Sequence, residues 1–250
     1  MQNTIIASNS KRGGGLDSAG GLFHASGLSR SAFTLAEVLI TLGIIGIVAA
    51  MTLPAITANS RRKEYSSRIK KFYSTMQQAI MRSEVDNSES IYWEKTDEIK
   101  DEEGTSDQIE NAKASEKFFN SYIKPYIKYL SVKKKTNSEE DKDINYELKI
   151  TMADGTVMYW HNGSCIDMRI DVNGNKQPNK SGYDQFTFVL CKEPTSKEAC
   201  GGNKHFCTYF PMRIPTREQA LAKCKSEPAY CSVVLQYDNW EFKDDYPFKI

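Results

Sequence analysis

The stretch from Phe33 to Leu53 constrains this chain more than any other part of its sequence, because Glu37 is the single charge in an otherwise apolar run. A helix needs about 20 apolar residues to cross the hydrocarbon of a bilayer, so this stretch has the length of a transmembrane helix. Residues 1–32 are rich in glycine and serine, lack periodicity and carry more basic than acidic residues. We therefore expect an unfolded leader on the cytoplasmic side of the membrane.

Glu37 is the most informative residue of the run. A carboxylate inside an apolar helix costs about 2.5–3.5 kcal/mol near the bilayer centre, so a positive partner is expected. Cleavage between Ala32 and Phe33 would create an α-amino group one helical turn before Glu37. On the same chain or on a neighbouring one, that ammonium is the natural counter-charge.

The sequence from Ala32 to Leu42, AFTLAEVLITL, resembles the cleavage and methylation motif of prepilin-type proteins. This superfamily includes type IV pilins and the pseudopilins of type II secretion and competence systems. The resemblance implies that a prepilin peptidase cuts after Ala32 and N-methylates Phe33, and that Glu37 sets the register of subunits in a filament. It departs from the family at Ala32, where glycine is usual.

Two other interpretations of the segment stay open. A secretory signal peptide or a signal anchor would also place basic residues before an apolar run, and residues 48–50 have the small side chains of a signal-peptidase site. Both leave Glu37 unexplained. The competing function is accordingly a membrane-anchored or secreted disulfide-bonded binding protein, or a hydrolase, that uses the segment only for export.

Beyond Pro54 the helix is expected to continue with one apolar face. Apolar residues recur there at steps of three and four, at Tyr65, Ile69, Phe72, Met76 and Ile80. The sequence predicts one helix from Phe33 to about Arg82. Its residues 33–54 would lie in the membrane or the filament core, and residues 55–82 would pack on a globular head.

The head, residues 83–250, is expected to combine helices and an antiparallel sheet, which makes the fold class α+β and pilin-like. Polar residues predict connecting loops at 83–113 and 131–144. A helix is expected from about Ala114 to Leu130, bent or broken at Pro125. The remaining expected elements are a hairpin over 146–160, strands at 165–172 and 184–190, a helix near 217–225 and a strand near 232–237.

All six cysteines lie in the predicted head, at Cys165, Cys191, Cys200, Cys207, Cys224 and Cys231. An even count behind a membrane segment predicts disulfides in an oxidising compartment and a disulfide-bonded C-terminal region. Reduced thiols in a cytosolic protein are the alternative. The connectivity cannot be read from sequence, and we favour only the local pair Cys224–Cys231.

Residues 171–186 are dense in oxygen-bearing side chains and turn formers. Calcium takes about six to eight oxygen ligands, and this loop resembles loops in the heads of pseudopilins, some of which hold calcium. The candidate ligands are Asp171, Asn173, Asn175 and Asp184. The alternative is a tight turn held by Asn and Asp side-chain hydrogen bonds.

Charge and motifs argue against several other functions. With 33 Lys+Arg and 32 Asp+Glu the net charge is +1, so no global basic field would hold nucleic acid. The sequence contains no nucleophile elbow, phosphate-binding glycine loop or zinc-finger spacing. We expect a filament subunit and not an enzyme. Its partners would be other pilin or pseudopilin subunits, a prepilin peptidase and an inner-membrane assembly platform. The resemblance places it in the bacterial inner membrane as a single-pass protein with its head outside the cytoplasm, and then in a filament at the periplasm or cell surface.

Overall fold

The computed structural model describes residues 33–138, 146–201 and 204–250. The predicted leader, with Ala32, lies outside these residues. The chain divides into two compact units, Met1–Ala49 and Ala50–Ile250.

Helix α1 runs from Leu35 to Asn87 and passes through both units. It confirms the prediction of one long helix, although it ends at Asn87 and not near Arg82. Pro54 lies inside the helix without ending it, which removes one backbone donor locally. In the first unit the apolar side chains of α1 are exposed, as Ile45 illustrates at 63%.

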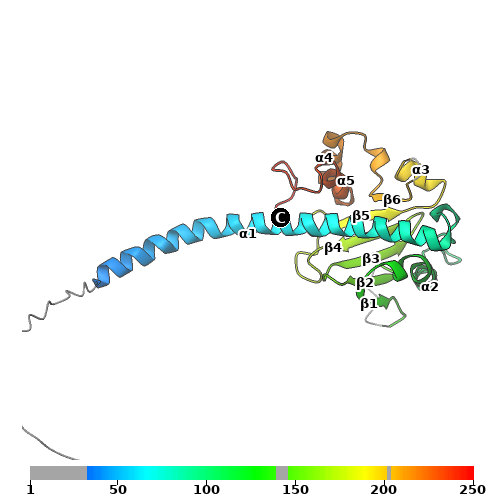
Figure 1. Ribbon diagram of the computed structural model, residues 1–250, viewed down its shortest axis with the longest axis horizontal. Coiled ribbons are helices and arrows are strands. Elements are labelled where there is room, and N and C mark those ends of the chain that lie inside the picture. Colours follow the sequence, from blue (N-terminus) through cyan, green and yellow to red (C-terminus); the bar gives the residue numbers. More distant parts are fainter. Residues whose placement is uncertain (1–32, 139–145, 202–203) are drawn as a thin grey trace, which may run out of the picture. The chain divides into compact units, whose positions relative to one another are not determined.

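A six-stranded antiparallel sheet forms the centre of the second unit, and each strand pairs with the next along the chain (Figure 1). The hairpin predicted over 146–160 is present, and Gly155 allows its tight turn by adopting φ +84°. The predicted strands at 165–172 and 184–190 are also present. The strands are β1 (Tyr129–Lys134), β2 (Leu148–Met152), β3 (Val157–Asn162), β4 (Ile166–Asp171), β5 (Gln185–Leu190) and β6 (Phe206–Thr208).

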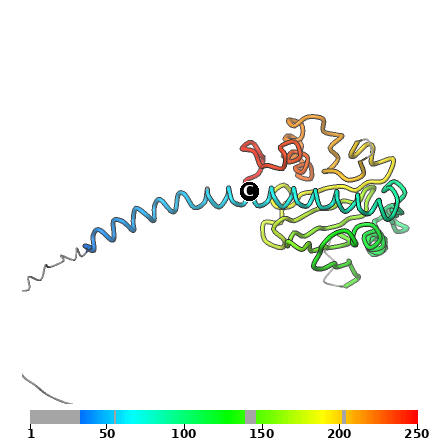
Figure 2. Tube along the Cα trace, viewed as in Figure 1, coloured from blue at the N-terminus to red at the C-terminus, as the bar shows by residue number. Residues whose placement is uncertain are grey.

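The second half of α1 packs on one face of this sheet, as the chain trace in Figure 2 shows. The predicted apolar face is confirmed, since Tyr65, Ile69, Phe72, Met76 and Ile80 are all buried. Alternate residues of the strands form the other side of this core, and Trp160 is fully buried there. α2 (Gln108–Phe118) contacts β1 to β3, whereas α5 (Cys231–Tyr237) contacts β5 and β6.

The remaining helical segments are short. They are α3 (Thr195–Ala199), α4 (Arg217–Ser226), the π-helical turn η2 (Phe119–Ile123) and the 3-10 turns η1 (Ser90–Tyr92), η3 (Lys124–Tyr126), η5 (Pro211–Arg213) and η6 (Pro228–Tyr230). Helix α4 confirms the helix predicted near 217–225. Its N-cap is Thr216, whose side chain accepts a hydrogen bond from the Gln219 N–H.

Three predicted elements are wrong in detail. The second helix begins at Gln108, inside the predicted loop 83–113, because Asp107 caps its first turn. It ends at Phe118 and is followed by the turns η2 and η3, the second of which contains Pro125. Residues 129–134 form strand β1 where a helix end and a charged loop were expected. Leu130, the expected last residue of that helix, is 68% exposed on β1. Strands at the edge of a sheet need little apolar alternation, which explains the error.

The strand predicted near 232–237 is also wrong, because Cys231–Tyr237 is helix α5. A short apolar run fits either a buried strand or a buried helix. Here the Cys224–Cys231 disulfide ties the segment to α4, and α5 packs against α4. The decision between strand and helix therefore comes from tertiary structure.

Candidate functional site

Phe33 and Glu37 lie at the start of α1, as the cleavage motif requires. Phe33 is 84% exposed. The Glu37 Oε2 accepts hydrogen bonds from the backbone N–H and the hydroxyl of Thr34, both at 2.9 Å. In return the Glu37 N–H donates to Thr34 Oγ1 at 3.2 Å. This reciprocal pair is a capping box, which the Thr-x-x-Glu spacing could have revealed and our sequence analysis missed.

The capping box changes the electrostatic argument for Glu37. One carboxylate oxygen already accepts two hydrogen bonds from the chain itself, which lowers the cost of placing the group near lipid. The carboxylate also lies in the first turn, where the helix dipole favours negative charge. Its local geometry is therefore fixed before any neighbouring chain approaches.

The large apolar side chains that follow Glu37 are exposed. Helix α1 is, among the residues the structure describes, the one helix long and apolar enough to cross a membrane. It suits a membrane anchor or a signal sequence. A Cβ added at Gly43 or Gly46 would meet nothing within 4 Å, so both positions leave the helix surface open to close approach by another helix.

The Asp171–Phe186 loop brings three of the four candidate calcium ligands together. Asn173 donates from its amide to Asp184 Oδ2 at 3.0 Å, and its backbone N–H donates to Asp171 Oδ1 at 3.2 Å. Asn175 points elsewhere, where its Oδ1 accepts from Lys149 Nζ at 3.0 Å. The Asn173 amide also donates to the Tyr65 hydroxyl on α1 at 2.9 Å.

The carboxylates of Asp171 and Asp184 accept hydrogen bonds from the chain itself. Each oxygen of the two aspartates already faces an N–H, including those of Gln185, Asn179 and Lys180. Calcium would need about six to eight oxygen ligands in all. Burial raises the pKa of Asp171 to about 6. The arrangement matches the alternative of a hydrogen-bonded turn, and calcium binding stays a prediction.

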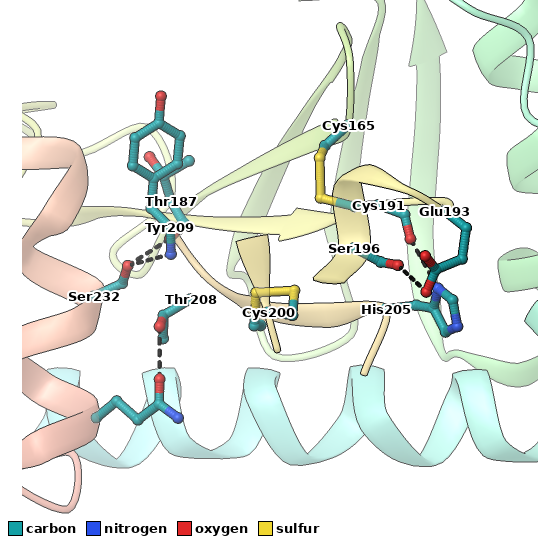
Figure 3. The surroundings of a disulfide bond; sticks show 12 residues. Cys165, Thr187, Cys191, Glu193, Ser196, Cys200, His205, Thr208, Tyr209 and Ser232 are labelled. Atoms are coloured by element: carbon teal, nitrogen blue, oxygen red, sulfur yellow. Dashed lines mark hydrogen bonds between the residues drawn. A yellow bond between two sulfur atoms is a disulfide. The ribbon is translucent and has the colours of Figure 1, made fainter. Parts of the chain in front are cut away.

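Three disulfides connect all six cysteines: Cys165–Cys191, Cys200–Cys207 and Cys224–Cys231. The favoured local pair is confirmed. Figure 3 shows two of these bonds near His205, whose Nδ1 lies 3.0 Å from the Cys191 carbonyl oxygen. The sulfurs are therefore not free to bind zinc beside that histidine. Disulfides of this number point to an extracytoplasmic head.

Within the described residues, no group of three or more His, Cys, Asp or Glu side chains is arranged to hold a metal ion. A family model described as "Family of unknown function (DUF6613)" matches residues 55–250. The matched part begins just after Pro54, and so covers the amphipathic half of α1 and the whole head. No curated protein and no solved structure matches the chain.

Proposed function

This chain belongs to DUF6613, a family of unknown function, and we propose from its own residues that it is a structural subunit of a type IV pilus or a type II secretion-like filament. In this proposal the chain is a pilin-like protein and not an enzyme. The single observation that carries it is Glu37, held in the first turn of an apolar helix whose large apolar side chains are exposed in the first unit.

The two halves of α1 differ in the way that such a subunit needs. Residues 55–82 present one apolar stripe, which is buried against the sheet. Residues 33–53 are apolar on all sides and exposed, so they require lipid or other helices as surroundings. A subunit that moves from the membrane into a filament would exchange lipid for the helices of neighbouring subunits around these residues.

Assembly would begin with cleavage between Ala32 and Phe33 and methylation of Phe33 by a prepilin peptidase. The processed helix would remain in the inner membrane until an assembly platform adds it to the filament. Gly43 and Gly46 permit close helix approach there. Head-to-tail association of identical subunits produces a fibre when the rotation between neighbours does not close a ring.

In the filament, the Glu37 carboxylate would pair with the amino group of Phe33 on the same or a neighbouring chain. Thr34 uses Oε2, and within the described residues no hydrogen bond to Oε1 is present. That second oxygen is available to an ammonium. A charge-assisted hydrogen bond between the two would be stronger than a neutral one, especially away from water.

Two measurements test the proposal. Mass spectrometry of the mature protein should find N-methylated Phe33 as the first residue, whereas cleavage near Ala50 would support the competing exported binding protein or hydrolase. The second is Glu37→Gln, because glutamine retains the capping box but removes the charge. We expect filament recovery in a sheared surface fraction to fall at least about tenfold, the equivalent of roughly 1.4 kcal/mol per subunit contact.

The matched control for that variant is Glu64→Gln on the same helix. Glu64 makes an exposed pair with Arg68 at 3.0 Å, and such surface pairs contribute little. Filament recovery should stay at the wild-type level in this control. Wild-type recovery in Glu37→Gln itself would refute the role assigned to the carboxylate.

A further inference from the structure

The sheet face opposite α1 carries a polar hollow. Side chains alternate between the faces of a strand, so Trp160 and Met168 enter the core while His161, Asp167 and Arg169 face the other way. The hollow has a volume of about 230 Å³. Its lining residues are Tyr146, Tyr159, His161, Asp167, Arg169, Ser181, Thr187, Tyr209 and Ala229.

Arg169 lines this hollow, and among the described residues no hydrogen bond or ion pair to its guanidinium is present. Its Nε is buried without a hydrogen-bond partner. The guanidinium makes a cation–π contact with the Tyr159 ring, 5.4 Å from the ring centroid. A buried donor left unpaired costs about 1–3 kcal/mol, and more when it is charged. The planar fork of Arg169 is therefore available to an anion.

Asp167 lies two positions along the same strand, about 7 Å away from Arg169 along the backbone. Within the part of the chain that the structure describes, no hydrogen bond to its carboxylate is present. Burial raises the pKa of Asp167 to about 6. His161, directly across on β3, is already held by Glu147 through a contact of 2.9 Å. The charge of Asp167 interacts with His161 across the strands, but its carboxylate oxygens accept no hydrogen bond from the described residues, so they can accept where Arg169 donates.

Aromatic rings surround these two groups. Tyr159 lies opposite Arg169 on β3, and its ring is 4.8 Å from the ring of Tyr146. Figure 3 shows Tyr209 and Thr187 on the side of the strands away from α1, where they complete the wall. Ligand sites commonly combine such aromatic walls with a few fixed polar groups.

We propose that this hollow binds one ring of an acidic saccharide, of the hexuronic acid type. The ring carboxylate accepts hydrogen bonds from the Arg169 fork. Ring hydroxyls, on the far side of the sugar, donate to Asp167, and the apolar C–H face packs on the tyrosines. An amino acid would suit the two charges but not their separation, because its ammonium and carboxylate are only two bonds apart. The proposal holds whether or not the chain polymerises.

The test is a titration of the full chain in detergent micelles with D-glucuronate, followed by calorimetry. D-Glucose keeps the ring without the carboxylate, acetate keeps the carboxylate without the ring, and glycine carries both charges on a small frame. We expect glucuronate to bind at least about tenfold more tightly than any of the three. Equal binding of glucose or acetate, preferential binding of glycine, or no binding of glucuronate at tens of millimolar would overturn the proposal.

Arg169→Gln should weaken glucuronate binding at least about tenfold, because the charged fork is lost. The matched control is Arg213→Gln, since Arg213 also stacks on an aromatic ring, 4.4 Å from the centroid of Phe210, but does not line the hollow. Asp167→Asn provides a second variant if Arg169→Gln fails to fold, and it should reduce binding severalfold. Unchanged binding in Asp167→Asn and in a folded Arg169→Gln would refute the site.

Discussion

Replacing Phe72 by alanine is expected to lower the free energy of unfolding of the head by about 4 kcal/mol. Phe72 is 4% exposed, and its ring centroid lies 5.1 Å from that of Phe188 and 6.5 Å from that of Phe206. Buried Phe→Ala changes cost about 3–5 kcal/mol, since transfer free energy is lost and a cavity remains. Aromatic pairs add about 0.5–1.5 kcal/mol, which places this site in the upper half of the range.

Urea unfolding followed by tryptophan fluorescence measures this change. The three tryptophans, Trp93, Trp160 and Trp240, are all buried in the head, so the signal excludes the apolar half of α1. With a denaturant slope of about 2.5 kcal/mol per molar, the midpoint should fall by about 1.6 M.

Val85→Ala is the control on the same helix, because Val85 is 85% exposed. Its effect should stay within about 0.5 kcal/mol. If the two substitutions shift the midpoint equally, the stripe from Tyr65 to Ile80 does not pack on the sheet. The assignment of α1 to two halves with different surroundings would then lose its structural basis.

Three further predictions concern the head. Replacing Cys165 and Cys191 together by alanine should lower the free energy of unfolding by about 3.5 kcal/mol, since the bond closes a loop with a sequence separation of 26; an unchanged urea midpoint would contradict this. Asp171 has a pKa raised to about 6, so the free energy of unfolding should fall as pH rises from about 4 to 6, while the unfolded chain has lost the proton and the fold still holds it. Asp171→Asn should remove up to about 1.4 kcal/mol per pH unit of that slope in urea titrations at several pH values. Asp107→Ala removes an N-cap that accepts from two backbone N–H groups, and should cost about 1 kcal/mol in the same assay, against no change if the cap is dispensable.

The parts of the fold that the sequence predicted are those where a local pattern and the tertiary structure agree. The five apolar positions of α1 follow a helical period over a long span, and Gly155 marks the turn of a strongly alternating hairpin. Strand β1 was missed because its edge position asks for little burial. Helix α5 was misassigned because a disulfide and its neighbour α4 determine its conformation, and neither can be read from its own residues.

The functional residues divide in the same way. Glu37 stands out in the sequence because a charge in an apolar run is costly wherever the chain folds, whereas the composition of the Asp171 loop suits either a metal site or a hydrogen-bonded turn. Oxygen-rich side chains serve equally well as acceptors for backbone N–H groups, and in this loop N–H groups donate to both aspartates. The Arg169 hollow, in contrast, could not be found from the sequence. Its residues are separated in sequence and belong to no motif, so only the pairing of β3, β4 and β5 brings an unpartnered guanidinium, a carboxylate and tyrosine rings to one surface.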